Sequence, residues 1–125
     1  MEKYIPDMDF DIMWEDECLG HITVFDEEII RAEQKDCELW KRFIPLECEK
    51  LTIPLLASLF LERLWDENRA DIDEVHRQLG VKYHNPFQMV LKTRGVDYDD
   101  KTWFRFKGDE NLTWAKDIDP RLEDF

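Results

Sequence analysis

The stretch DMDFDIMW, residues 7–14, alternates acidic with apolar side chains and decides how the chain begins. A repeat of two residues is typical of a β-strand that buries one face and exposes the other. The stretch HITVF, residues 21–25, is rich in β-branched and aromatic side chains, which favour a second strand. The residues between these stretches can form the connection. We therefore predict an acidic N-terminal β-hairpin over residues 7–25.

Two helices are predicted next along the chain. Asp26 is a residue type that caps helices, and acidic residues follow it where the helix dipole favours negative charge. This pattern, with an imperfect apolar stripe behind it, predicts a helix over residues 27–43. Residues 53–66 are apolar on nearly every side, which is typical of a helix in the middle of a domain. We expect the other helices to surround that one.

The rest of the chain predicts two more helices and a second hairpin. The acidic start at residues 71–74 and the pair Asn85-Pro86 are typical of helix N-termini, and a glycine follows each helix. Residues 101–107, KTWFRFK, alternate again and precede a turn-like GDEN stretch. These residues predict a C-terminal hairpin over residues 101–115, with an extended tail over 117–125.

Together these elements predict one α+β domain over residues 1–125. Its helical core is expected over residues 27–95, with about four helices around the helix at 53–66 and a hairpin at each end. No apolar run is long enough to span a membrane, and no secretory signal is recognisable at the N-terminus. Three cysteines at irregular spacing do not indicate a disulfide framework, so we expect a reducing, cytoplasmic environment.

Charge is the strongest functional signal in the sequence. The chain of 125 residues has a net charge of −13, and residues 1–50 hold 15 acids against 6 bases. Such a field repels nucleic acid and speeds association with basic proteins. A simpler alternative is that acidity only keeps a small protein in solution. The oligomeric state is not predicted.

The predicted partner-binding surface is the acidic part of the N-terminal hairpin. Alternate carboxylates on one strand face lie about 6.6–6.8 Å apart, so they can mimic a phosphate backbone or pair with a Lys/Arg groove. The alternative is a solvated strand face that discourages edge-to-edge aggregation. A tryptophan beside Arg105 is expected as an exposed binding anchor, or else as a residue packed under the tail. The candidate contact residues are Asp7, Asp9, Asp11, Glu15, Asp16, Glu17 and Trp103.

These features favour a small acidic protein-interaction module. An inhibitor, an immunity protein or a phage anti-defence protein would occupy the basic, nucleic-acid-binding surface of its partner in this way. The alternative is a winged-helix-like transcriptional regulator that binds DNA through residues 82–107. The predicted order of elements from residue 53 onward, helices and then a hairpin, is the order found in a winged helix-turn-helix. Its candidate DNA contacts are Gln88, Lys92, Arg94, Lys101, Arg105 and Lys107.

Neither a metal nor a catalytic site is predicted. Cys18-x-x-His21, with Cys37 and Cys48, contains the ligand types of a zinc site, but nothing in the spacing makes them converge, and free cysteines are the commoner outcome. The three histidines have no triad or metalloprotease spacing. We therefore expect no cofactor and no enzymatic activity.

Overall fold

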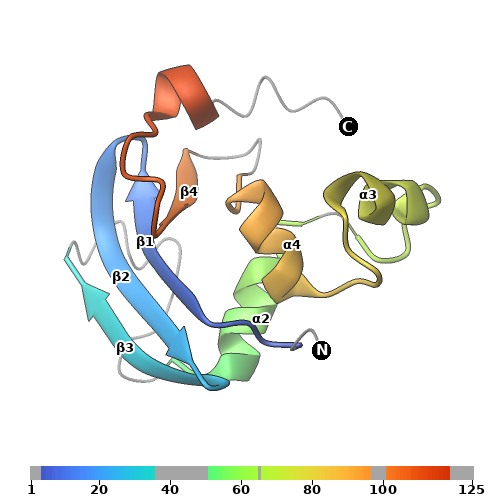
Figure 1. Ribbon diagram of the computed structural model, residues 1–125, viewed down its shortest axis with the longest axis horizontal. Coiled ribbons are helices and arrows are strands. Elements are labelled where there is room, and N and C mark those ends of the chain that lie inside the picture. The colour runs from blue at the N-terminus through green and yellow to red at the C-terminus, as the bar shows by residue number, and fades with distance from the viewer. Residues whose placement is uncertain (1–3, 36–50, 65, 97–100, 119–125) are drawn as a thin grey trace.

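The computed structural model describes residues 4–35, 51–64, 66–96 and 101–118. Four antiparallel strands form one sheet in the order β3-β2-β1-β4 (Figure 1). The strands are β1 (Met8–Trp14), β2 (Glu17–Phe25), β3 (Glu28–Gln34) and β4 (Thr102–Phe106). The helices are α2 (Ile53–Leu61), α3 (Ile72–Leu79), α4 (Pro86–Thr93) and the short π-helix η2 (Trp114–Ile118).

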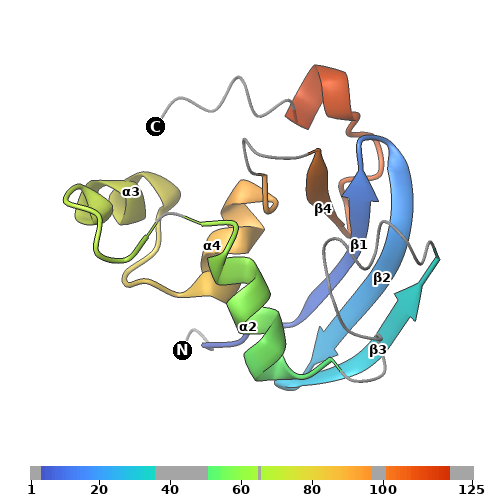
Figure 2. The same ribbon diagram turned by 180° about the vertical axis from the view of Figure 1, so that it is seen from behind.

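The alternation in β1 places its apolar residues on the face of the sheet that the helices cover, here called the inner face. Met8, Phe10 and Ile12 are all buried, and β1 pairs with β2 over the predicted residues. The Phe10 ring packs against Phe60 of α2 and Phe104 of β4, with ring centroids 6.0 and 5.2 Å apart. Figures 1 and 2 show α2 and α4 side by side against this face, while α3 packs against α4 farther from the sheet.

The helices confirm the predicted starts but not the predicted arrangement. The side chains of Thr52 and Asn85 cap α2 and α4, and Gly80 ends α3 with a φ of 77°. However, α2 ends at Leu61 rather than at residue 66, and it buries only one side. The described part of the chain contains three α-helices, not about four around a central one.

The predicted helix over residues 27–43 is wrong where the structure describes it. Residues 28–34 form β3, and residues 36–43 lie outside the described residues. The register between β2 and β3 shifts so that Thr23 faces Arg31 and Val24 faces Ile29. This β-bulge leaves Ile30 unpaired and lets Ile29 and Ala32, three residues apart, pack on the same core. Their helix-like spacing is therefore produced by a bulged strand.

The predicted C-terminal hairpin is also wrong. The strand over residues 102–106 exists, but it pairs with β1 at the edge of the N-terminal sheet. Residues 114–118 form η2 instead of a returning strand, and residues 119–125 of the predicted tail lie outside the described residues. Alternation predicts a strand correctly but does not identify its partner, since that choice depends on contacts far along the chain.

The turn between β2 and β3 is strained. Asp26 and Glu27 have φ values of 52° and 65°, as in a type I′ turn, where glycine or asparagine is usual. We expect Glu27→Gly to raise the free energy of unfolding by about 0.5–1 kcal/mol, because relief of left-handed strain exceeds the entropy that glycine loses on folding. Urea unfolding measures this change. The matched control Glu28→Gly, at a strand position, is expected to destabilise; a loss of stability in both variants would contradict the prediction.

Candidate functional site

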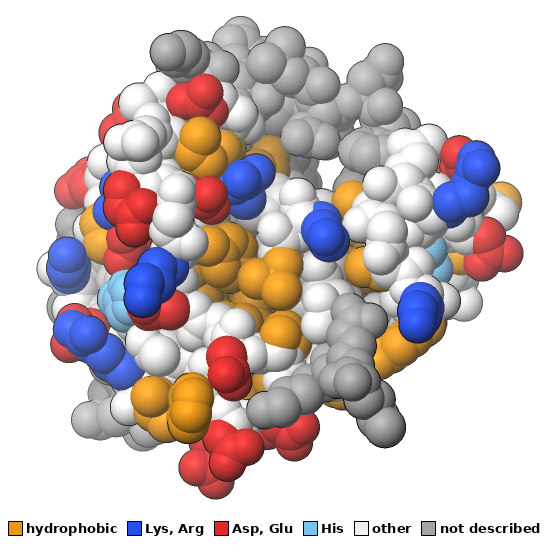
Figure 3. Space-filling model, viewed as in Figure 1, with side chains coloured by type: hydrophobic (Ala, Val, Ile, Leu, Met, Phe, Trp, Pro, Cys, Tyr) orange, Lys and Arg blue, Asp and Glu red, His pale blue; other side chains and the backbone are white. Residues whose placement is uncertain are grey.

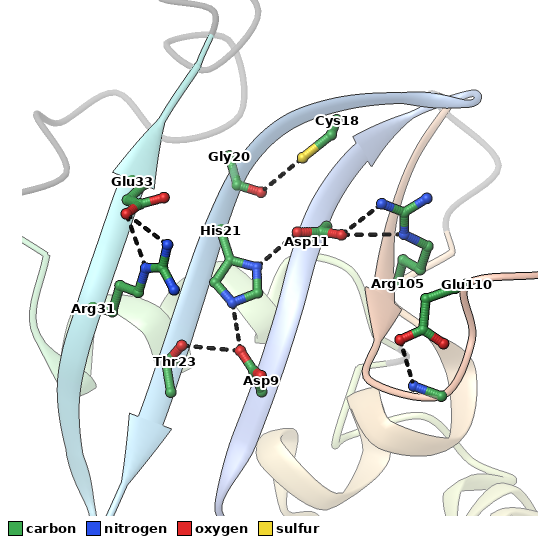
Figure 4. A network of polar contacts seen from close by, with 11 residues as sticks. Asp9, Asp11, Cys18, Gly20, His21, Thr23, Arg31, Glu33, Arg105 and Glu110 are labelled. Atoms are coloured by element: carbon green, nitrogen blue, oxygen red, sulfur yellow. Dashed lines mark hydrogen bonds and ion pairs between the residues drawn. The ribbon is translucent and has the colours of Figure 1, made fainter.

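The outer face of the sheet, opposite α2 and α4, carries a network of polar and charged side chains from three strands. We call its five residues, Asp9, Asp11, His21, Thr23 and Arg105, the polar face. The strand register forms this group, because Asp11 lies opposite both His21 on β2 and Arg105 on β4. Asp9 lies opposite Thr23 in the next row. Figure 4 shows these side chains directed toward one another across the strands.

His21 lies between the two carboxylates of β1. Its Nδ1 atom is 2.7 Å from Oδ1 of Asp11, and its Nε2 atom contacts Oδ1 of Asp9. A carboxylate only accepts hydrogen bonds, so a ring nitrogen that carries a proton donates to the aspartate it contacts. Through these two contacts His21 joins β2 to β1.

The two aspartates are held in their charged forms. Burial alone would raise the pKa of Asp11, but hydrogen bonds from His21 and Arg105 and their charges lower it overall. The Arg105 Nη2 atom is 2.7 Å from Oδ2 of Asp11. Burial would also raise the pKa of Asp9. Hydrogen bonds with Thr23 and His21 and the nearby charge of Lys107 outweigh burial, so the pKa of Asp9 is lowered overall.

These lowered pKa values predict the acid dependence of stability. A carboxyl group with a folded-state pKa below its unfolded value stabilises the fold above that unfolded value, about 3.9, and loses this effect as pH falls. We expect Asp9→Asn/Asp11→Asn to be less stable than the natural chain at neutral pH. The difference should narrow between about pH 5 and pH 3. Urea unfolding across this range measures it, with Asp73→Asn on α3 as the control.

A difference that stays constant over this range would contradict the prediction. Lys107 and Glu110, which line the same region, remain unchanged in the variant. The pH dependence of the difference in unfolding free energy therefore reports on the two β1 carboxylates.

Two adjoining hollows lie beside the polar face. The first, of about 260 Å³, is the polar hollow and is lined by charged residues of the polar face together with Lys107 and Glu110. The second, of about 340 Å³, is the apolar hollow and includes Met8, Val24 and Leu91. Both are lined by Asp9, Phe106 and Lys107, so the two hollows are immediate neighbours.

The structure divides the predicted acidic surface into neutralised and exposed parts. Asp9 and Asp11 already have partners within the polar face, and Glu15 forms an ion pair with Lys101 at 2.9 Å. Asp16 accepts a hydrogen bond of 2.8 Å from the backbone N–H of Trp114, and Glu17 is exposed. The carboxylates of β1 therefore do not form a free anionic row.

Sequence reasoning missed a second acidic group. Asp26, Glu27 and Glu28, here called the acidic turn, are all exposed, and none takes part in an ion pair between described residues. The backbone N–H of Asp26 donates a hydrogen bond of 3.1 Å to Asp7, which brings a fourth carboxylate to this end of the sheet. The sequence assigned these acids to a helix, so their place beside Asp7 was not predicted.

Of the two alternatives for Trp103, an exposed anchor or a residue packed under the tail, the structure contradicts the first. Its side chain is 0% exposed and packs with Met13 and Ile118 on the part of the outer face beside η2. The indole N–H donates a hydrogen bond of 2.6 Å to the backbone oxygen of Glu15. Trp103 and Arg105 do share one face, as the alternation indicated, but this end of that face is covered.

Three of the six candidate DNA contacts are paired with acids. Arg94 pairs with Asp109, Lys101 with Glu15 and Arg105 with Asp11, at 3.0, 2.9 and 2.7 Å. Lys92 and Lys107 are exposed, whereas Gln88 is half-buried on α4. α4 packs its apolar side into the core, and β4 belongs to the main sheet instead of to a separate wing. The arrangement that motivated the DNA-binding alternative is therefore not formed.

The candidate zinc ligands do not converge in the described part of the chain. The Cys18 thiol contacts the backbone oxygen of Gly20 at 3.4 Å, and burial raises its pKa. Cys37 and Cys48 lie outside the described residues. No group of three or more metal-ligand side chains occurs among the residues that the structure describes.

No protein-family model, curated protein or solved structure matches the chain. Within the described ranges, no helix has the length and apolar character needed to cross a bilayer.

Proposed function

We propose that this chain is a small acidic interaction module that binds a cationic surface on a partner protein. The contact begins at the acidic turn and Asp7. An inhibitor, an immunity protein or a phage anti-defence protein that covers the nucleic-acid-binding surface of its target would work in this way. The proposal includes no catalytic step and no cofactor.

The observation that carries this proposal is the contrast between the two acidic groups. On β1, Asp11 is already compensated by Arg105 and His21, so a partner would have to compete with internal ion pairs. At the acidic turn, three exposed carboxylates have no ion-pair partner among the described residues. An incoming lysine or arginine would meet uncompensated charge there. The net charge of −13 adds long-range attraction for a basic partner.

Affinity capture from a lysate of the source organism tests this function. We compare the tagged natural chain with the variant Asp26→Asn/Glu27→Gln/Glu28→Gln. A basic partner is expected to be retained by the natural chain at low salt and released as salt rises. Its affinity for the variant should be about tenfold lower, taking roughly 0.5 kcal/mol for each exposed ion pair.

A matched control separates local contact from total charge. The variant Glu62→Gln/Glu67→Gln/Asp73→Asn removes the same three charges from exposed positions at the end of α2, after it and on α3. It should retain the partner as the natural chain does. If both variants lost the same amount of partner affinity, the total charge of the chain, and not the acidic turn, would determine binding. Capture that is independent of salt would contradict the proposal.

A further inference from the structure

The apolar hollow lies at the end of the sheet where β1 extends beyond the last residue of β4. Met8 and Val24 form a floor that is almost completely inaccessible, and Leu91 of α4 and Phe106 form partly exposed walls. Figure 3 shows hydrophobic side chains gathered in a depression near the middle of this view, with charged side chains around them. The volume of about 340 Å³ is near the lower end of the usual range for ligand pockets.

Phe25 extends this apolar surface outward. Its side chain also lines the hollow, yet it is 57% exposed at the last position of β2. An aromatic side chain left this accessible beside a hollow is typical of an interaction site. The hollow therefore offers burial for one large apolar side chain of a partner, with Phe25 packed against it.

The charged side chains around the hollow favour a basic partner. Asp7 lies on its rim, and the hydrogen bond from the Asp26 N–H to Asp7 places the acidic turn directly beside it. Asp9 also lines the hollow but already has His21 and Thr23 as partners, and Lys107 is the one cationic side chain among the described lining residues. The rim and the adjoining turn are therefore strongly negative in sum. A segment with lysine or arginine on both sides of an apolar residue complements this pattern.

We propose that the apolar hollow, with Phe25 and the acidic turn, binds a short basic segment of a partner protein that inserts one large apolar side chain. This inference rests on the proposed function and adds the chemistry of the ligand. The acidic turn supplies attraction and orientation, while the hollow supplies the contact that depends on side-chain shape. Electrostatics alone would not distinguish two segments of equal charge.

Two synthetic peptides of equal charge test the inference, Lys-Lys-Phe-Lys-Lys and Lys-Lys-Ser-Lys-Lys, with binding measured by calorimetry or NMR titration. The natural chain should bind the Phe peptide about tenfold or more tightly than the Ser peptide, as expected for burial of one aromatic side chain. Phe25→Ser and Leu91→Ala should each reduce that preference. Leu55→Ser, which alters an exposed leucine on α2, should leave it unchanged. Thermal unfolding verifies that each variant is folded.

The outcomes separate this inference from the proposed function. Equal binding of both peptides would overturn the hollow as an anchor site while leaving cationic recognition intact. Absence of binding by either peptide would count against both proposals. Equally tight binding of Glu-Glu-Phe-Glu-Glu would overturn the choice of a basic ligand. Dimerisation that Phe25→Ser abolishes would instead make the occupant a second copy of the chain, and the proposal would fail.

Discussion

Trp103→Ala is expected to lower the free energy of unfolding by about 3–5 kcal/mol, as is usual when a large aromatic side chain is removed from a core. The indole is fully buried against Met13 and Ile118, so its removal leaves a cavity. The backbone oxygen of Glu15 also loses the hydrogen bond from the indole N–H. Urea unfolding monitored by circular dichroism measures the loss.

Trp103→Phe is the matched variant. It keeps much of the apolar volume but removes the N–H donor, so we expect an intermediate loss of about 1–3 kcal/mol. If Trp103→Ala instead left stability unchanged and weakened partner binding, the tryptophan would be an exposed anchor after all. That result would contradict its buried position beside η2.

Gly95→Ala should destabilise the chain by about 3 kcal/mol, combining left-handed backbone strain with overpacking. Gly95 has a φ of +65°, and an added Cβ would overlap the ring of Phe104. That ring is completely buried and packs against Phe10 and Phe60, so relieving the overlap requires the aromatic core to shift. The expected observation is a lower urea midpoint with an unchanged denaturant slope.

Gly80→Ala separates the two contributions to that loss. Gly80 has a similar φ of +77°, but an added Cβ would meet nothing within 4 Å. Its substitution should therefore cost only the backbone strain, about 1 kcal/mol. Equal losses at the two glycines would show that the Phe104 contact contributes nothing.

Local patterns predicted the elements whose signals lie within a few residues. The alternation of β1, the cap of α4 and the glycine after α3 depend on spacing and on single side chains. β3 was misread because its bulge gives Ile29 and Ala32 a helical spacing. A bulge is set by pairing with a neighbouring strand, and a single segment does not contain that information.

The candidate site was predictable only in part, for the same reason. Alternation correctly put Asp9 and Asp11 on one face, but their counter-charges come from His21 on β2 and Arg105 on β4. Only the register of three strands identifies those pairs. The acidic turn was not predicted as a binding surface, because the sequence predicts a helix where the structure has a β-turn followed by β3.

The pairing of β4 with β1 has a consequence for biosynthesis. The ion-paired residues Asp11 and Arg105 are 94 positions apart, so the described sheet is completed only after β4 has left the ribosome. Until then, one edge of β1 has no partner strand. Such an edge is prone to pair with strands of other chains, and late, long-range closure slows folding. A nascent chain or a fragment that ends before residue 102 is therefore expected to aggregate or to occupy chaperones.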